Sequence, residues 1–289
     1  MVLLKKQIES ILFMKKFTLN CGGKLLEIKQ PIVMAIINIT PDSFFDGNSY
    51  TTKDAVLKQV EKCLLEGATI IDIGGASSRP GATLLTADEE WNRLEAHITA
   101  IHTYFPNALL SVDTYHSKVA DFAIQNGVSI INDISGGTED ANMFAVAAKH
   151  TCPIILMHHQ GNMQTMHQNA NYTEILTDIY DFFIQQIALA HRFGIKDVIL
   201  DVGFGFSKNM EQNYHILKNL SFYSIINQPI LVGLSMKSML YKLLNISPKE
   251  ALNATMVANT VALQQGASIL RVHDVKAAQQ CIKIYQQLQ

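Results

Sequence analysis

Polar side chains that can bind a ligand stand at the ends of short apolar runs along this chain. The first run leads into IINITPDSFFDG at residues 36–47, where β-branched residues give way to Asn38 and then to an acidic, aromatic loop. Six other runs end in the same way. The residues at these ends are Asn38, Asp113, Asn132, His158, Asp201, Lys237 and the pair Arg271 and His273. A single aspartate at such a place commonly caps the next helix, but this repetition favours a shared binding site.

These side chains fall into two chemical groups. One group mixes hydrogen-bond acceptors with donors, as the amino-pyrimidine edge and carbonyl of a pterin or a purine require. It consists of Asp113, Asn132, Asp201 and Lys237. The other group offers an amide oxygen for a hard cation and donors for anionic oxygens, which suits a diphosphate or a triphosphate. It consists of Asn38, Arg271 and His273. We therefore expect a heterocycle to bind beside a phosphate group.

The elements that must position these residues alternate between short strands and helices. Near-continuous apolar strands that alternate with helices are typical of a parallel sheet buried on both faces. Eight strands are expected, at 31–38, 69–73, 108–113, 129–133, 153–158, 197–201, 229–235 and 268–274. The pattern predicts an α/β fold, a (β/α)8 TIM barrel, with a doubly wound sheet as the alternative. In such a barrel the carboxyl ends of all strands meet at one mouth.

The parts outside this repeat are also predictable. The segment KFTLNCGGKLLEI predicts a short N-terminal β-hairpin that covers the bottom of the barrel, so residues 1–30 form an extension and hairpin within a single domain of residues 1–289. Helical spacing of apolar residues recurs at 51–67, 86–104 and 248–266. Thr52 and Thr86 are expected to cap two of these helices at their start, and Gly67 and Gly266 stand where helices end.

Composition narrows the class of protein. Hydrophobic residues make up 48% of the 289 residues and charged residues 17%, which indicates a folded globular chain. The formal net charge of −2 provides no basic field for nucleic acid or an anionic membrane. The N-terminal apolar runs are too short for a signal peptide or a membrane span. The four cysteines are too far apart for a zinc cluster or a disulfide framework, so we expect a cytoplasmic setting.

Several segments, taken in order, resemble the dihydropteroate synthase family. They are INITPDSFFDG, IIDIGGASSRPGA, SVDTY, IINDI, LMHHQGNMQTM, ILDVGFGF, VGLSMKS and RVHDV, and the resemblance runs from about residue 31 to the C-terminus. It implies a TIM-barrel transferase that condenses 6-hydroxymethyl-7,8-dihydropterin diphosphate with 4-aminobenzoate, giving 7,8-dihydropteroate and diphosphate for folate synthesis. It also implies Mg2+ as cofactor, sulfonamides as competitive inhibitors, and a homodimer formed through helices near the C-terminal end of the barrel.

The resemblance also assigns roles to individual residues. The implied pterin site is Asp113, Asn132, Asp201 and Lys237, with Met157, Gly205 and Phe206 as walls. The implied diphosphate site is Asn38, Arg271 and His273, where Asn38 is also the ligand of Mg2+. Loops after the first and second strands are expected to act as lids, and the implied positions in them are Phe44, Asp46, Ser78, Arg79 and Pro80. The implied aminobenzoate pocket is Phe44, Pro80, Lys237 and Ser238, and the implied catalytic residues are Asp46, Lys237 and Arg79.

The chain also departs from the family pattern. Ala76 replaces an acidic residue and Ser78 a threonine in the second loop, and Val202 stands where proline is usual. His159 replaces a methionine and is expected at the mouth, facing solvent. Met236 replaces the usual arginine, which leaves one cation fewer near the aminobenzoate end. Two alternatives therefore stay open: a non-catalytic pterin-binding paralogue, and a pterin-dependent methyltransferase of the corrinoid type.

Overall fold

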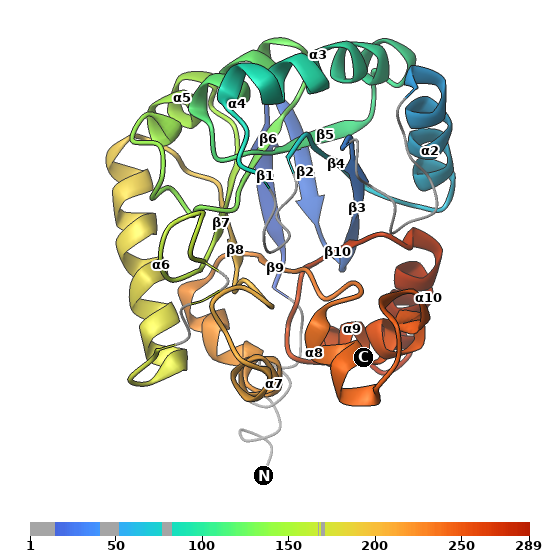
Figure 1. Ribbon diagram of the computed structural model, residues 1–289, viewed down its shortest axis with the longest axis vertical. Coiled ribbons are helices and arrows are strands. Elements are labelled where there is room, and N and C mark those ends of the chain that lie inside the picture. The colour runs from blue at the N-terminus through green and yellow to red at the C-terminus, as the bar shows by residue number, and fades with distance from the viewer. Residues whose placement is uncertain (1–14, 41–51, 77–82, 167, 169–170) are drawn as a thin grey trace.

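Eight parallel strands form a closed barrel in this computed structural model, which describes residues 15–40, 52–76, 83–166, 168 and 171–289 (Figure 1). The order around the barrel is β10-β3-β4-β5-β6-β7-β8-β9, so the last strand closes on the first. The strands are β3 (Ile32–Asn38), β4 (Ile70–Gly74), β5 (Leu109–Asp113), β6 (Ile130–Asp133), β7 (Ile154–Met157), β8 (Val198–Asp201), β9 (Ile230–Val232) and β10 (Ile269–Val272). The predicted TIM barrel is confirmed, and the doubly wound alternative is excluded.

Helices surround the barrel and follow its strands (Figure 1). They are α2 (Lys53–Leu65), α3 (Ala87–Tyr104), α4 (Ser117–Gln125), α5 (Met143–His150), α6 (Ile175–Arg192), α7 (Met210–Lys218), α8 (Ser238–Leu244), α9 (Leu252–Gln264) and α10 (Val275–Gln286). Two 3-10 helices, η2 (Leu220–Ile226) and η3 (Pro248–Glu250), lie between them. In the described part of the chain, we find no helix with the length and apolar character needed to cross a membrane.

Two of the predicted helix starts agree with the structure, and one predicted helix does not. Thr52 accepts a hydrogen bond from the backbone of Ala55, and Thr86 forms a capping box with Glu89, so both predicted caps are confirmed. The continuous helix predicted at 248–266 is wrong. Ser247 instead caps η3 in a box with Glu250, and α9 begins only after that short 3-10 turn.

The hairpin of β1 (Phe17–Cys21) and β2 (Lys24–Ile28) covers the bottom of the barrel, as predicted (Figure 1). Its inward side chains pack with one layer of residues from the barrel interior. These are Leu19, Cys21, Leu26 and Ile28 from the hairpin, with Ile32, Met34, Ile70, Ile130, Ile155, Ile199, Leu231 and Ile269 from the strands. Because side chains alternate along a strand, the residue two positions after each of these also points inward, which places the next layer at the mouth.

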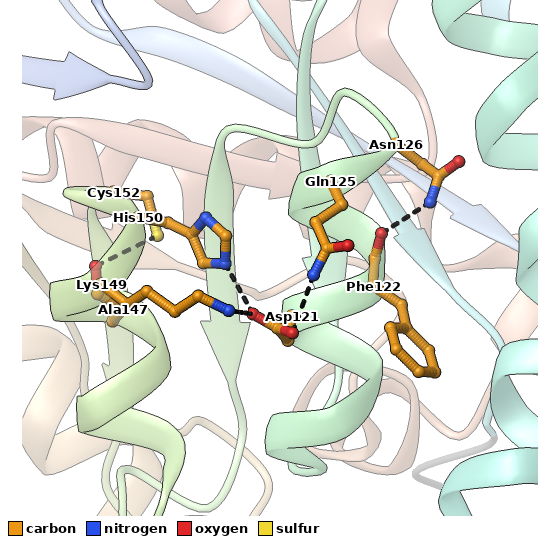
Figure 2. A network of polar contacts seen from close by, with 8 residues as sticks. All are labelled: Asp121, Phe122, Gln125, Asn126, Ala147, Lys149, His150 and Cys152. Atoms are coloured by element: carbon orange, nitrogen blue, oxygen red, sulfur yellow. Dashed lines mark hydrogen bonds and ion pairs between the residues drawn. The ribbon is translucent and has the colours of Figure 1, made fainter.

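Polar contacts tie α4 to α5 on the outside of the barrel (Figure 2). One carboxylate oxygen of Asp121 accepts hydrogen bonds from Lys149 at 2.8 Å and from His150 at 2.6 Å. The other accepts from the amide of Gln125 at 2.8 Å. The hydrogen bond from Lys149 is the largest of the effects that lower the pKa of Asp121. The Asp121 side chain is 22% exposed, so this network lies at the edge of the surface.

We predict that Asp121→Asn lowers the free energy of unfolding at pH 7 by about 1 kcal/mol, the upper range for such pairs. A lowered carboxyl pKa stabilises the fold fully above the unfolded pKa of about 4, and this contribution is lost as the pH falls through the folded pKa. The difference between the two proteins should therefore narrow below about pH 4 in urea unfolding. Glu27→Gln, at a pair more than half exposed on both sides, is the control. A difference independent of pH would contradict this account.

Candidate active site

Strand register brings the polar strand ends into one layer at the mouth of the barrel. Asn38, Gly74, Asp113 and Asn132 are consecutive register partners on four neighbouring strands. Met157 and Asp201 are partners on β7 and β8 in the same way. Each of these residues lies two or four positions after an inward residue of the layer below, so it also lies on the inner face of its strand. The predicted convergence of these groups therefore follows from the alternation of side chains and the closure of the barrel.

Gly74 allows two of these groups to lie side by side. A Cβ atom at Gly74 would lie 3.4 Å from the Cβ of Asp113 and 3.5 Å from Oδ1 of Asn38. A Cβ at this register position would therefore be in van der Waals contact with both side chains. The absent side chain leaves the amide oxygen of Asn38 next to the carboxylate of Asp113.

The charged centre of the site is Arg271, which reaches from β10 to two other strands. Its Nε donates to Oδ2 of Asp72 at 2.7 Å, and its Nη2 donates to Oδ2 of Asp113 at 2.5 Å. The same oxygen of Asp72 also accepts a hydrogen bond from Nδ2 of Asn132 at 3.0 Å. The two chemical groups expected from the sequence are therefore not separate, because Arg271 of the phosphate group pairs with Asp113 of the heterocycle group.

Burial and charge oppose each other in this network. Burial raises the pKa of Asp113 to about 7, although the guanidinium of Arg271 acts against that rise. Burial disfavours the charge on Arg271, but the carboxylates of Asp72 and Asp113 outweigh it and raise its pKa above its usual value. The arginine therefore stays charged, and the proton on Asp113 is the one that a ligand can change.

A second pair of charged groups lies on β8 and at the start of α8. Burial lowers the pKa of Lys237 to about 8, against the effect of Asp201. Burial raises the pKa of Asp201, whose Oδ1 accepts a hydrogen bond from the backbone of Gly203 at 2.8 Å. The ammonium of Lys237 lies 4.2 Å from the ring centroid of Phe206. A flat polar ring that enters here meets an acceptor, a donor and an aromatic face.

An apolar group of side chains adjoins these charges. It consists of Tyr115, Ile134, Met157, Met163, Met166 and Phe206, all buried and packed together. Met157 and Phe206 were expected as walls of the site, whereas the others were not. The motif LMHHQGNMQTM contains the two missed methionines, but its spacing alone does not say which side chains turn inward. Methionine adapts to flat and irregular ligands, so this group suits the face of a heterocycle.

The remaining predicted residues lie at the rim. Nδ1 of His273 lies 3.0 Å from the hydroxyl of Ser235, and its backbone N–H donates to the same oxygen at 3.3 Å. Ser238 begins α8. Met236 adopts a left-handed backbone with φ of 55°, and its N–H donates to the hydroxyl of Thr255 at 3.1 Å. Predicted positions that lie outside the described residues are Phe44, Asp46, Ser78, Arg79 and Pro80.

Two histidines differ from what the sequence suggested. His158 follows the inward Met157, so its ring points out of the barrel, where it packs edge-on against Phe182 at 5.0 Å. Burial holds its pKa well below the usual value. The structure therefore does not bring His158 into the site. His159 was expected to face solvent, but it is only 7% exposed.

Two buried carboxyl groups were missed. Asp72 is fully buried inside β4, and the signal for it was an aspartate within the apolar strand IIDIG, at an inward position. Glu90 on α3 accepts a hydrogen bond from the hydroxyl of Thr114, the neighbour of Asp113, at 2.9 Å. Burial raises the pKa of Glu90 to about 8. The helical spacing of apolar residues did not indicate that Glu90 would be buried, because it is one of three acidic residues in the first turn of α3.

Among the described residues, no cluster of three or more His, Cys, Asp or Glu side chains is arranged to hold a metal ion. Asn38 offers a neutral oxygen at the mouth, and Arg271 on the adjacent strand β10 provides positive charge. Mg2+ prefers oxygen ligands and is commonly held by one or two side chains together with substrate phosphates. The donor set therefore fits a Mg2+ ion that is bound jointly with a phosphate-bearing ligand.

Comparisons with known proteins agree with this site. A family model described as pterin binding enzyme matches residues 34–273. The dihydropteroate synthase of Escherichia coli strain K12 is 39% identical over 264 residues, which cover 91% of this chain and 93% of that enzyme. The Yersinia pestis dihydropteroate synthase, solved as a sulfonamide drug complex, superposes with a TM-score of 0.89 at 38% identity, covering 94% of this chain and 99% of that one.

A more distant structure extends the same agreement. The Thermus thermophilus dihydropteroate synthase, solved in complex with 4-aminobenzoate, superposes with a TM-score of 0.85 at 30% identity, covering 94% of this chain and all, 100%, of the other. The family model begins within β3, at residue 34, and ends at His273. It therefore covers the other seven barrel strands in full and leaves out α10. The chain therefore belongs to the dihydropteroate synthase family, whose members are transferases.

Proposed function

We propose that the barrel mouth condenses 6-hydroxymethyl-7,8-dihydropterin diphosphate with 4-aminobenzoate, giving 7,8-dihydropteroate and diphosphate for folate synthesis. The observation that carries this proposal is the buried network in which Arg271 joins Asp72 and Asp113. It puts acceptors for a pterin next to a cation for a diphosphate. Relatives support this proposal, because one was solved with 4-aminobenzoate and another in the presence of pteroic acid, which joins a pterin to an aminobenzoate.

The pterin half of the site is assigned to the buried acceptors and donors. We propose that the carboxylates of Asp113 and Asp201 accept hydrogen bonds from the amino-pyrimidine edge, and that Asn132 and Lys237 bind the remaining polar atoms. Met157 and Phe206 would cover the ring faces. Because these groups are buried, an unmatched ring leaves them unpaired at a cost of about 1–3 kcal/mol each. This cost gives the site its selectivity for a pterin.

The diphosphate half is assigned to Asn38, Arg271 and His273. In the proposed reaction the bond between the pterin methylene carbon and the diphosphate oxygen breaks before the new bond forms. The amine of 4-aminobenzoate then attacks that carbon and loses a proton. Mg2+, when bound at Asn38, supplies charge neutralisation for the leaving oxygens. Arg271 adds fixed positive charge on the same side, and preorganised charge of this kind usually supplies much of a rate enhancement.

The second substrate is assigned to the outer part of the mouth. We propose that Lys237 and Ser238 contact 4-aminobenzoate, together with Phe44 and Pro80, which lie outside the described residues. Asp46, Arg79 and Lys237 are the proposed catalytic residues, and Ser78 lies with Arg79 in the second loop. Asp46 would stabilise the pterin cation through its negative charge. All four described cysteines are free and buried, which suits the cytoplasm as the proposed setting.

The test of this function is the release of diphosphate from the pterin diphosphate in the presence of 4-aminobenzoate and Mg2+. A non-catalytic paralogue would bind the pterin without releasing diphosphate, and a methyltransferase would not need the diphosphate.

We predict that Asn38→Ala raises the KM for the pterin diphosphate about tenfold, equivalent to about 1.4 kcal/mol, while the Kd of the bare pterin stays unchanged. Removal of Mg2+ with a chelator should abolish the difference. Equal losses for both ligands would make Asn38 a structural residue.

Met236 gives a second prediction. A guanidinium binds a carboxylate with two parallel hydrogen bonds, whereas methionine offers only apolar contact. We expect Met236→Arg to lower the KM for 4-aminobenzoate about tenfold and to leave the KM for the pterin diphosphate unchanged, because the buried acceptors are untouched. Met236→Gln, which adds polarity without charge, is the matched control. Steady-state kinetics that show no change for either variant would mean that this side chain does not reach the substrate.

We also propose a homodimer formed through an apolar surface of the C-terminal helices. These helices are neighbours, since α8 and α10 both contact α9 (Figure 1). The apolar side chains that are more than half exposed on these helices or directly after α10 are called here the C-terminal patch. They are Leu243, Leu244, Val257, Ile284 and Leu288. Large apolar side chains gathered on one face commonly mark a protein interface.

We predict that Val257→Glu and Ile284→Glu each convert the dimer to a monomer, because a buried charge without a partner opposes association. Sedimentation velocity measures the change directly. Leu65→Glu is the matched control, since Leu65 is 83% exposed on α2, outside the patch. A wild-type protein that sediments as a monomer would refute the proposed dimer. Dimers that survive both substitutions would place the interface elsewhere.

A further inference from the structure

One lysine outside the assigned site is buried with its ammonium fully bonded. Lys208 lies in the loop that follows β8, and its side chain is only 9% exposed. Its Nζ donates to the backbone carbonyls of His158 at 3.1 Å, Gly203 at 3.1 Å and Phe206 at 3.0 Å. An ammonium has three protons to donate, so these three carbonyls use all of them.

The three carbonyls belong to segments that carry the pterin half of the site. His158 directly follows Met157 on β7. Gly203 lies two residues after Asp201, and its N–H donates to that carboxylate at 2.8 Å. Phe206 is the ring against which Lys237 lies. The ammonium of Lys208 therefore bonds the backbone close to the acceptor Asp201 and to both expected wall residues, Met157 and Phe206.

The backbone segments after β7 and β8 lie very close to each other beside this ammonium. A Cβ atom at Gly203 would lie 2.1 Å from the carbonyl oxygen of His158, and the φ of Gly203 is +69°. The two strand ends thus approach as closely as a glycine allows. The backbone N–H of His158 also donates to the carbonyl of Asp201 at 2.8 Å.

A charged lysine is a costly way to fill this space. Burial lowers the pKa of Lys208 to about 7, and Asp201 acts against that effect. Among the described residues, no carboxylate lies within ion-pair distance of this ammonium. A methionine would fill a similar volume without the loss of hydration. The role of the ammonium is therefore to hold these three carbonyl groups in place.

We propose that Lys208 is a positioning residue for pterin recognition, whose ammonium sets the spacing between Asp201, Met157 and Phe206. The inference rests on the proposed function, because it concerns the pterin half of that site. Lys208 itself does not touch the substrate in this account. It acts through the three carbonyls, and its removal lets the acceptor and the two walls move apart.

Other contacts hold the same loop from its outer side, so the loop does not depend on Lys208 alone. Oδ1 of Asn213 on α7 accepts from the N–H of Gly205 at 2.8 Å, and its Nδ2 donates to the carbonyl of Lys208 at 3.1 Å. The hydroxyl oxygen of Ser207 lies within hydrogen-bond distance of the carbonyls of Gln160 and Met166, at 2.8 and 2.6 Å, and can donate its proton to either. A variant at Lys208 should therefore fold, with its defect confined to the inner side of the loop.

The first experiment compares Lys208→Met with the wild type. We expect the Kd of a bare pterin, measured by calorimetry, to rise about tenfold or more, and the KM for 4-aminobenzoate to change less than about twofold. Lys218→Met, on the exposed side of α7, is the matched control and should change neither value. A wild-type Kd in a folded Lys208→Met protein would overturn the proposal.

The second experiment separates positioning from general loss of structure. Lys208→Ala removes three carbons and the ammonium, which propylammonium can replace. We expect added propylammonium to restore pterin affinity, whereas tetramethylammonium, with the same charge and no proton to donate, should not. If propylammonium restores only the melting temperature, Lys208 has a purely structural role. If the wild type neither binds a pterin nor releases diphosphate, the proposed function fails, and this inference fails with it.

Discussion

The guanidinium of Arg271 pairs with carboxyl groups from two other strands inside the barrel, Asp72 on β4 and Asp113 on β5. Two buried carboxylates that close together cannot both stay charged without such a partner. Asp72 is fully buried and accepts from both Arg271 and Asn132. The second carboxylate, on Asp113, is thereby left near the balance between its two protonation states. The arrangement of the mouth depends on this one cation, because Arg271 holds both carboxyl groups by hydrogen bonds and acts against the rise in the pKa of Asp113.

The same cation joins the two halves of the site. Arg271 bonds Asp113, which belongs to the proposed pterin half, and it lies on β10, two residues before His273 of the proposed diphosphate half. A diphosphate that binds near Arg271 therefore shares its positive charge with Asp113. In the proposed reaction, departure of that diphosphate would return the full charge of Arg271 to the carboxylates. The fold thus connects the state of the leaving group with the groups that hold the ring.

Around this centre, the barrel meets the cost of buried charge with backbone groups. Lys208 is satisfied by three carbonyls, and Asp133 by the N–H groups of Ser135 and Gly137 together with the hydroxyl of Ser135. Hydrogen bonds from the backbone cost no further burial of charge, since those groups need partners in any case. Loops built in this way hold their shape at the mouth and leave the neighbouring side chains available for ligands.

The sequence alone determined the barrel, because each of its strands is a short apolar run and the pattern of strands and helices repeats eight times. It also placed Asn38, Asp113, Asn132 and Asp201 at one mouth, since parallel strands in a closed barrel end on the same side. The caps at Thr52 and Thr86 are local, so they too were predictable. All these features depend on residues close together in the chain or on a simple alternation.

Only the tertiary structure decided which of these groups bond to one another. Arg271 reaches Asp72 and Asp113, which lie 199 and 158 residues away, through the closure of β10 on β3. The outward turn of His158 and the burial of His159 follow from the place where β7 ends, a boundary that the sequence does not mark to one residue. The three carbonyls around Lys208 come from two loops, the one after β7 and the one after β8. Such contacts arise only when distant segments are packed together, so no local pattern of residue types contains them.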